Sequence, residues 1–411
     1  MIAQKVIARE VSGLGDPLFD HGLSLAVWII LVVKAVAIFA LVMGSVVFMV
    51  MYERKAVAYL GVRYGPNRAG PNGWLQSVAD GTKLLFKEAF TPRGADKVVY
   101  KIAPYLMMVP AVLAFSIVPL GGTITVAHHT TDLQLANPPW GILFLLMCSG
   151  ISVYGVMLAG WASGSKYPLL GSVRASAQLV SYEAVLGLTT ATVVVVSSSL
   201  RTTAIVAAQH GPFLYHWNFL RTAIIPFAVF SIAITAEMTR PPFDLVEAEE
   251  ELSGGYNLEY ASTDFMWFYL AEYAALVTNS AIIVTLWFGG PDGPRIASHS
   301  IGPIWFVIKL LIILYIYVWI RATLPRLRYD QLMDLGWKRL IPLGLAMLLI
   351  VAGFQVNRKW GLIAFGAAVV LGLLLWRAID VGHEASALEA ERDERVTRNG
   401  PMGRPSQEAP R

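Results

Sequence analysis

The sequence predicts an all-α, polytopic membrane protein with about nine transmembrane helices, interfacial amphipathic helices and long cytoplasmic loops. Hydrophobic residues make up 56% of the 411-residue chain and charged residues only 15%, whereas soluble domains carry about 25% charged residues. Apolar residues gather in runs of roughly 20, the length that a helix needs to cross a bilayer. Lys and Arg collect in alternate connections, as they do on the cytoplasmic side of membrane proteins.

Nine apolar segments are predicted to be membrane spans. Inside a bilayer a helix satisfies its own backbone hydrogen bonds, so each run is expected to be helical. The eighth is the weakest, because it is short and only the residues QVNRK join it to the ninth; a buried re-entrant pair remains an alternative there. The segments are Leu25–Met51, Val98–Leu120, Trp140–Gly160, Leu179–Leu200, Leu220–Ala236, Phe265–Phe288, Ile304–Thr323, Leu340–Phe354 and Trp360–Trp376.

The distribution of basic residues predicts the orientation and the domains. The connection after the first span is rich in Lys and Arg, which places it in the cytoplasm and the N-terminus outside. Nine crossings then put the C-terminus in the cytoplasm. Residues 1–24 are predicted as an extracytoplasmic segment, residues 25–379 as the membrane domain and residues 380–411, which are polar, as a disordered tail. No small-residue cleavage site follows the first run, so we interpret it as an anchor.

Residues 74–90 of the first cytoplasmic loop have the period of an amphipathic helix. Leu75 and Phe86 fall on its apolar side, and Asp80 and Lys83 fall on its polar side. Such a helix can lie in the membrane interface. Two interpretations stay open: an ordinary surface helix with solvated charges, or a rim past which a lipophilic molecule enters from the bilayer.

Three carboxylates lie inside predicted spans: Glu183, Glu237 and Glu272. A charge at the centre of a bilayer costs about 2.5–3.5 kcal/mol, so such residues usually face a partner or a water-filled cavity. At a rise of about 1.5 Å per residue, each lies within a few turns of the cytoplasmic face. They suit a polar path for protons that starts in the cytoplasm. The alternative is that each acid is satisfied locally by an arginine or by backbone groups.

The connection between Glu237 and Glu272 gathers six acids around one base, Arg240. Six ionised neighbours would repel one another, so we expect them to titrate as a set. The alternative is a solvated acidic loop that docks on a basic partner. The acids are Asp244, Glu247, Glu249, Glu250, Glu251 and Glu259.

The few cysteines and histidines limit the chemistry of this chain. Cys148 is the single cysteine, which excludes an intrachain disulfide and an iron–sulfur cluster held by this chain alone, since a cluster needs about four thiolates. The seven histidines form no H-x-x-H pattern, and we expect no bound metal. The net charge of +4 follows the basic loops and does not indicate nucleic-acid binding.

Four long blocks carry a family resemblance, and they run in order from Glu53 to Pro342. They are ERKAVAYLGVRYGPNRAGPNGWLQSVADGTKLLFKE, LAGWASGSKYPLLGSVRASAQLVSYE, RPPFDLVEAEEELSGGYNLEYA and RATLPRLRYDQLMDLGWKRLIP. They resemble the membrane subunit of respiratory complex I, the proton-translocating NADH:quinone oxidoreductase, that meets the peripheral arm (the bacterial H type and the mitochondrial subunit 1 type). The chain departs from that family at Glu250 and Pro241, where small residues are common, and in a ninth span beyond the family's eight-span core.

The resemblance implies a translocase subunit of the respiratory chain in a bacterial plasma membrane. It would frame a quinone chamber with the peripheral arm and couple quinone reduction to proton translocation. Ubiquinone or menaquinone would be the substrate, while NADH, FMN and the iron–sulfur clusters would belong to partner subunits, and no cofactor would be bound by this chain alone. The partners implied are the peripheral-arm subunits of the quinone site, the adjacent small membrane subunits and membrane lipids.

The resemblance also implies site residues, by their positions in the matching blocks. Quinone binding is implied for Arg54, Lys55, Arg63, Asp80, Lys83 and Arg174. Proton coupling is implied for Glu183, Glu237, Glu247, Glu249, Glu251, Glu259 and Glu272. Two alternatives remain: the homologous subunit of a membrane-bound hydrogenase-type complex, or an autonomous ion carrier, for which internal repeats would be expected.

Overall fold

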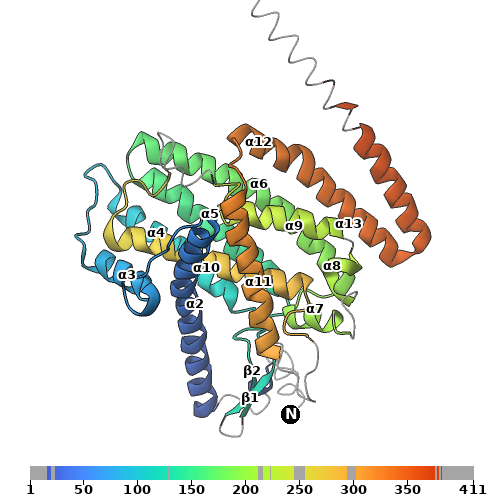
Figure 1. Ribbon diagram of the computed structural model, residues 1–411. Helices are drawn as coiled ribbons and strands as arrows, with labels where there is room; N and C mark the ends of the chain where they lie inside the picture. Colours follow the sequence, from blue (N-terminus) through green and yellow to red (C-terminus); the bar gives the residue numbers. More distant parts are fainter. Residues whose placement is uncertain are drawn as a thin grey trace, which may run out of the picture. The chain divides into compact units, whose positions relative to one another are not determined.

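The computed structural model describes residues 16–19, 24–126, 129–211, 216–222, 224–244, 255–293, 302–374, 377–378 and 381. Within these ranges the chain is built almost entirely of helices (Figure 1), and its two strands, β1 (Thr123–Val126) and β2 (His129–Asp132), form one antiparallel hairpin. The all-α, polytopic prediction is confirmed. The chain forms two compact units, Met1–Leu348 and Leu349–Arg411; the architecture below is that of the first unit.

Seven helical segments of the described chain are long and apolar enough to cross a membrane. The predicted fifth span is a shorter apolar helix, α9 (Ile224–Glu237), and the predicted ninth span corresponds to helical residues 358–374 of the second unit. The count of nine spans therefore stays a prediction. The seven are α2 (Leu25–Leu60), α4 (Lys97–Phe115), α5 (Gly141–Ala162), α6 (Lys166–Ser197), α10 (Ser262–Trp287), α11 (Gly302–Thr323) and the continuous run of α12 (Tyr329–Asp334), η5 (Leu335–Leu340) and α13 (Ile341–Val356).

The first spanning helix is longer than predicted. α2 has 36 residues, about 54 Å at 1.5 Å per residue, whereas the hydrocarbon core of a bilayer is about 30 Å thick. It continues nine residues beyond Met51, the predicted end. The last turns of α2 therefore carry charged residues that the prediction assigned to a loop. The shorter elements are η2 (Pro17–Phe19), η3 (Pro71–Gly73), α3 (Gln76–Phe86), α7 (Thr202–Ala208) and α8 (Asn218–Arg221).

Helix α10 lies at the centre of the first unit. It packs against α2, α3, α4 and α11, while α5 packs between α4 and α6, and α6 packs against α9 (Figure 1). Of the most apolar window of α10, 83% is buried, against 11% for α2. Residues on α10 are thus surrounded by other helices, whereas most of α2 presents apolar side chains to its surroundings.

Glycines allow α5 to approach its two neighbours closely. A Cβ on Gly155 would lie 2.9 Å from the backbone nitrogen of Met107 and 3.1 Å from the carbonyl oxygen of Ala103, both on α4. A Cβ on Gly160 would lie 2.4 Å from the carbonyl oxygen of Pro168 on α6. Small residues at such crossings are typical of helix packing in membranes.

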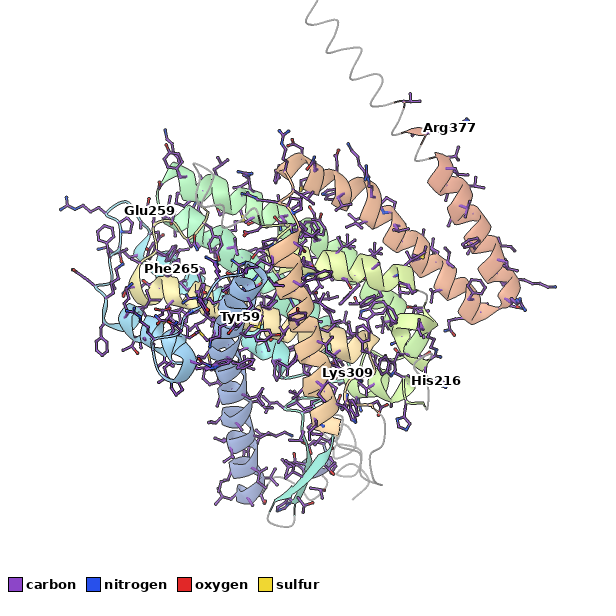
Figure 2. All side chains as sticks on the ribbon, viewed as in Figure 1. Tyr59, His216, Glu259, Phe265, Lys309 and Arg377 are labelled. Carbon is purple, nitrogen blue, oxygen red and sulfur yellow. The ribbon has the colours of Figure 1, made fainter. Side chains whose placement is uncertain are left out.

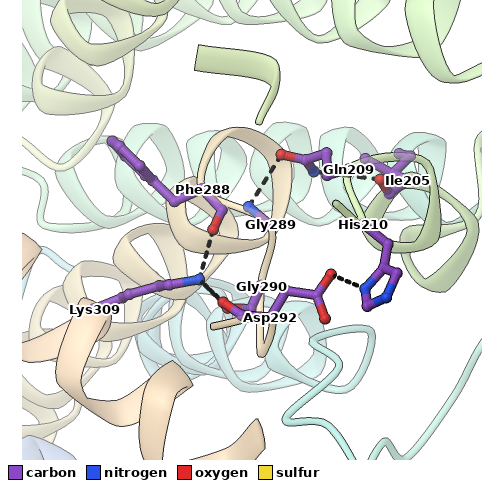
Figure 3. Close-up of polar contacts among 8 residues, drawn as sticks. All are labelled: Ile205, Gln209, His210, Phe288, Gly289, Gly290, Asp292 and Lys309. Carbon is purple, nitrogen blue, oxygen red and sulfur yellow. Dashed lines mark hydrogen bonds and ion pairs between the residues drawn. The ribbon is translucent and has the colours of Figure 1, made fainter. Parts of the chain in front are cut away.

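The C-terminal end of α10 is closed by a lysine from α11 (Figure 3). Lys309 Nζ donates to the carbonyl oxygens of Phe288 (2.7 Å), Gly290 (3.0 Å) and Asp292. The last carbonyls of a helix have no partners within it, and an ammonium group supplies three donors. His210 Nδ1 lies 2.7 Å from the Asp292 carboxylate and adds α7 to this cap.

A second charged contact ties the N-terminal segment to the strands. Lys34, the lone charge in the first predicted span, lies 2.6 Å from Asp16 Oδ2, and its Nζ donates to Thr131 Oγ1 at 2.9 Å. Burial raises the pKa of the Asp16 carboxyl, but the hydrogen bond from Lys34, with those from Leu18 and Thr131, outweighs burial and holds that pKa below its usual value. The Asp16 carboxylate is therefore ionised at neutral pH, and its contacts with Lys34 and Thr131 anchor the segment.

Candidate functional site

Four charged side chains form a cluster where α2, α10 and α11 meet. We name it the buried charged cluster because three of the four are buried; the fourth, Arg321, is exposed. Arg240 Nη1 donates to both oxygens of Glu53, at 2.8 and 3.1 Å, and Arg321 Nη1 donates to Glu53 Oε1. Arg240 Nη2 lies 3.0 Å from Glu272 Oε1. Glu53, Arg240 and Glu272 are each less than 10% exposed. Two positive and two negative charges balance, which matters because an unpaired buried charge is costly.

The local structure explains why these residues meet. Glu53 lies on the part of α2 that extends beyond the predicted span, and Glu272 lies on the central helix α10. Arg240 follows α9 in a tight turn in which Thr239 has a positive φ of 50°. Its guanidinium carbon lies 4.4 Å from the centre of the Tyr273 ring, an arrangement that favours a cation. Burial lowers the pKa of Arg240, but Glu272 and Glu53 raise it above its usual value.

A cavity opens beside this cluster, and we name it the α2 cavity. It holds about 780 Å³ of space not occupied by protein atoms. Its wall combines guanidinium groups, a carboxylate and phenol rings with the backbone of the Gly65-Pro66 turn, so that it is both polar and aromatic. The residues that line it are Glu53, Arg54, Val57, Ala58, Arg63, Tyr64, Gly65, Pro66, Tyr269, Tyr273 and Arg321.

Helix α3 is joined to the α2 cavity through Asp80. The carboxylate of Asp80 accepts hydrogen bonds from Arg54 Nη1 (2.6 Å) and from Gln76 Nε2 (3.0 Å). Partial burial raises the pKa of Asp80, but the hydrogen bonds from Arg54 and Gln76 and the nearby charge of Lys83 hold it below its usual value. Asp80 is therefore ionised at neutral pH. None of the residues of α3 is buried, and Phe86 is 87% exposed.

A second cavity lies inside the bundle, and we name it the internal cavity. Its space among α4, α5, α6, α9 and α10, counted together with the part open to solvent, is about 880 Å³. Most of its wall is apolar, with a few polar groups that include Ser149, Glu237, Thr239 and Asn279. The Ser149 hydroxyl donates a hydrogen bond to Glu237 Oε1. Glu237 is half-buried and contributes to the wall of this cavity.

The predicted quinone-binding residues separate into two groups. Arg54 and Arg63 line the α2 cavity, and Asp80 is paired with Arg54. Lys55 instead donates to the carbonyl oxygen of Asn72 and lies 4.9 Å from the centre of the Trp74 ring. Lys83 is exposed on α3. Arg174 lies on α6, 5.5 Å from the centre of the Tyr329 ring.

The predicted acids of the spans also fall into two groups. Glu237 and Glu183 approach the same turn of α5, since a Cβ on Gly150, next to Ser149, would lie 3.1 Å from Glu183 Oε1. Glu272 belongs to the buried charged cluster. The two groups are connected through residues 237–240, because Glu237 and Thr239 line the internal cavity and Arg240 holds Glu53.

The acidic connection is described only in part. Glu247, Glu249, Glu250 and Glu251 lie outside the described residues. Glu259 is partly buried, and its carbonyl oxygen accepts a hydrogen bond from the Tyr100 hydroxyl at 2.8 Å. Figure 2 shows Glu259 near Phe265, at the first turn of α10, and Lys309 toward the opposite end of that helix.

The sequence pattern did not point to Glu53 or Arg321, and it indicated Arg240 only as the base of the acidic loop. The signal for Glu53 was present: it follows the apolar run of the first span directly, and a helix continued through it would carry a carboxylate on its buried face. The partners of Glu53 come from positions 187 and 268 residues away in sequence. Spacing along the chain gives no indication of contacts at such separations.

The described ranges of the chain offer no cluster of metal ligands. They contain no group of three or more His, Cys, Asp or Glu side chains that could hold a metal ion.

Comparison with known proteins identifies relatives over most of the chain. The family described as NADH dehydrogenase matches residues 33–352. The H subunit of the NADH-quinone oxidoreductase of Frankia alni is 44% identical over 401 residues, which cover 93% of this chain and 85% of that protein. The protein of the same name from Frankia casuarinae is 46% identical over 382 residues, which cover 89% of this chain and 83% of that protein.

Proposed function

The chain belongs to the NADH dehydrogenase family, and from that membership we propose that it is the membrane subunit of NADH-quinone oxidoreductase that receives quinone and couples its reduction to proton translocation. The redox centres would then lie on other subunits of the complex, in keeping with a single cysteine in this chain. The chain is a multi-pass membrane protein. We propose that its N-terminus lies outside and its basic loops in the cytoplasm, as the charge distribution favours.

One observation carries the proposal: the α2 cavity shares Glu53 and Arg321 with the buried charged cluster. A quinone headgroup has two carbonyl oxygens that accept hydrogen bonds, and the guanidinium groups of Arg54 and Arg63 and the phenol of Tyr269 are suitable donors. The isoprenoid tail requires an apolar approach. The exposed apolar side chains of α3, such as Leu85 and Phe86, support an entrance on that side.

The same observation supports a route by which quinone reduction in the α2 cavity drives proton transfer elsewhere in the chain. Reduction of a quinone consumes two electrons and two protons, so negative charge develops transiently in the α2 cavity. Glu53 lines this cavity and pairs with Arg240 behind it in a balanced cluster, where any added charge alters the balance of the pairs. Residues 237–240 carry this change to Glu237 in the internal cavity. On this basis we propose that Glu183, Glu237 and Glu272 take part in proton coupling. For the loop acids Glu247, Glu249, Glu251 and Glu259, the proposal rests on the family to which the chain belongs.

Replacement of Glu237 by Gln tests the coupling role. The amide has nearly the same shape as the carboxyl group but cannot exchange a proton at neutral pH. In membrane vesicles with the assembled complex, we expect the rate of proton translocation to fall at least about a hundredfold, because a positioned proton-transfer group contributes about 10²–10⁴-fold. The matched control is Glu88→Gln, the same chemical change at an exposed position. Normal translocation in Glu237→Gln at normal subunit content would refute the role.

A further inference from the structure

Two adjacent residues of α5, Ser149 and Gly150 in the segment CSGIS (residues 148–152), each lie beside an acid from a different helix. Ser149 donates a hydrogen bond to Glu237 at the end of α9. Gly150, the next residue, faces Glu183 of α6, whose Oε1 stands 3.1 Å from the place where a Cβ would be. Successive residues on a helix point about 100° apart. One turn of α5 therefore lies beside both carboxylates. The Ser149 hydroxyl donates to Glu237, and Gly150, which has no side chain, leaves open space beside Glu183.

The Ser149 hydroxyl differs from other serine hydroxyls in the same helices. Ser152, Ser176 and Ser181 each donate to a carbonyl oxygen three or four residues earlier, at 2.6–2.8 Å. That bond to the helix backbone is the usual arrangement of serine inside a helix. The Ser149 hydroxyl donates to a carboxylate instead, and Ser149 is one of the residues that line the internal cavity.

A serine hydroxyl is one donor and also an acceptor. While its proton is directed at Glu237, its lone pairs remain able to accept a hydrogen bond from water in the internal cavity. A proton delivered by hydronium to the Ser149 oxygen displaces the original hydroxyl proton onto Glu237 Oε1. Water remains, the serine is regenerated and the carboxylate becomes a carboxyl group. The reverse sequence releases the proton.

We propose that Ser149 is a positioning residue for proton exchange at Glu237, and that Gly150 keeps open the space in which the Glu183 carboxylate stands beside the same turn. The proposal rests on the proposed function, because it requires that Glu237 exchange protons during turnover. It adds a route to that exchange that involves α5, a helix in which the sequence pattern indicated no site residue.

The test compares Ser149→Ala with Ser149→Thr and Ser152→Ala in the complete complex in membrane vesicles. Loss of one hydrogen bond to a charged group corresponds to roughly tenfold, so we expect Ser149→Ala to lower the rate of proton translocation by about that factor. Ser149→Thr, which keeps the hydroxyl, is expected to restore it to within about twofold of the unmodified complex. Ser152→Ala removes a hydroxyl one turn away whose partner is the Ser149 carbonyl, and is expected to have little effect.

The dependence of translocation on pH separates this role from a structural one. A structural defect lowers the rate of translocation by the same factor at all pH values. Loss of the Ser149 hydroxyl instead shifts the curve of rate against pH for Ser149→Ala along the pH axis, relative to the unmodified complex. The curve for Ser152→Ala is expected to superimpose on that of the unmodified complex. Gly150→Ala is a second variant that leaves the hydroxyl in place, and we expect a reduced rate because its methyl group displaces Glu183.

The outcomes separate the role of Ser149 from the proposed function of the chain. If Glu237→Gln abolishes translocation while Ser149→Ala matches the unmodified complex in rate and pH profile, the role of Ser149 is overturned and the proposed function stands. If neither variant affects translocation, both are overturned. If Ser149→Ala fails to assemble, Ser149→Thr and Gly150→Ala decide. A rate within about twofold of normal in Ser149→Thr together with a reduced rate in Gly150→Ala supports the proposal, and any other combination of the two overturns it.

Discussion

At the scale of single residues, the charge balance around Glu53 is the feature that most constrains the site. Glu53 accepts hydrogen bonds from two guanidinium groups while almost completely buried, and Glu272 pairs with the second nitrogen of Arg240. Each charge is compensated only while all four are present. Such a cluster holds its members in place and responds to a new charge in the adjacent α2 cavity.

Substitution of Glu53 by Gln should therefore destabilise the subunit. It leaves Arg321 and Arg240 with one carboxylate between them, and loss of one partner of a buried ion pair costs about 3–5 kcal/mol. We expect a lower yield of assembled complex and a lower temperature of dissociation, measured by native gel electrophoresis after stepwise heating. Asp330→Asn is the control, because Asp330 and its partner Arg328 are 75% and 81% exposed. Equal thermal stability of Glu53→Gln and Asp330→Asn would contradict the account of the cluster.

The sequence predicted some of these residues and could not predict others, for a physical reason. Glu183, Glu237 and Glu272 are conspicuous because each is a carboxylate in an apolar run. Arg54 and Arg63 were predicted through the family resemblance, and both line the α2 cavity. The pairing of Arg240 with Glu53 and Glu272 depends on the turn after α9 and on contacts across the bundle, which no local pattern encodes.

At the scale of elements, the predicted spans agree with the helices in order and differ mainly at their ends. The apolar run of the first span ends near Met51, but α2 continues to Leu60, because helix formation requires only that the backbone stay hydrogen bonded and not that the side chains stay apolar. The predicted fifth span is a helix of 14 residues. Composition predicts the hydrophobic region of a helix better than its two ends.

The packing of α5 against α4 gives a prediction at this scale. Gly155→Ala would place a methyl group 2.9 Å from a backbone nitrogen of α4, so the two helices must move apart, at a cost of about 1–3 kcal/mol for overpacking. Gly187→Ala is the matched control, because no atom lies within 4 Å of its Cβ position and the change from Gly to Ala favours a helix. Thermal unfolding of the solubilised protein should show a lower transition temperature for Gly155→Ala alone. Equal transitions for the two variants would argue against close packing at Gly155.

At the scale of the whole molecule, one short turn of the first unit links the internal cavity to the charged cluster beside the α2 cavity. The α2 cavity lies beside the buried charged cluster, and the internal cavity contains Glu237 and the Ser149 hydroxyl. Residues 237–240 line the internal cavity through Glu237 and Thr239, and they contact the buried charged cluster through Arg240. This arrangement supplies what coupling requires: a place where charge changes, an adjacent cluster that responds to it, and a titratable group beyond. The fold class was predictable from composition and hydropathy, whereas the two cavities arise from tertiary packing.

The most direct test of the account is to identify where quinone binds. A photoreactive quinone analogue is cross-linked to the assembled complex, and the adducts are located by mass spectrometry with and without an excess of the native quinone. We expect adducts on this chain within residues 53–66 and 269–273 or at Arg321, which together contribute the wall of the α2 cavity, and we expect the native quinone to suppress them. Adducts that the native quinone suppresses but that lie only outside these segments would contradict the account.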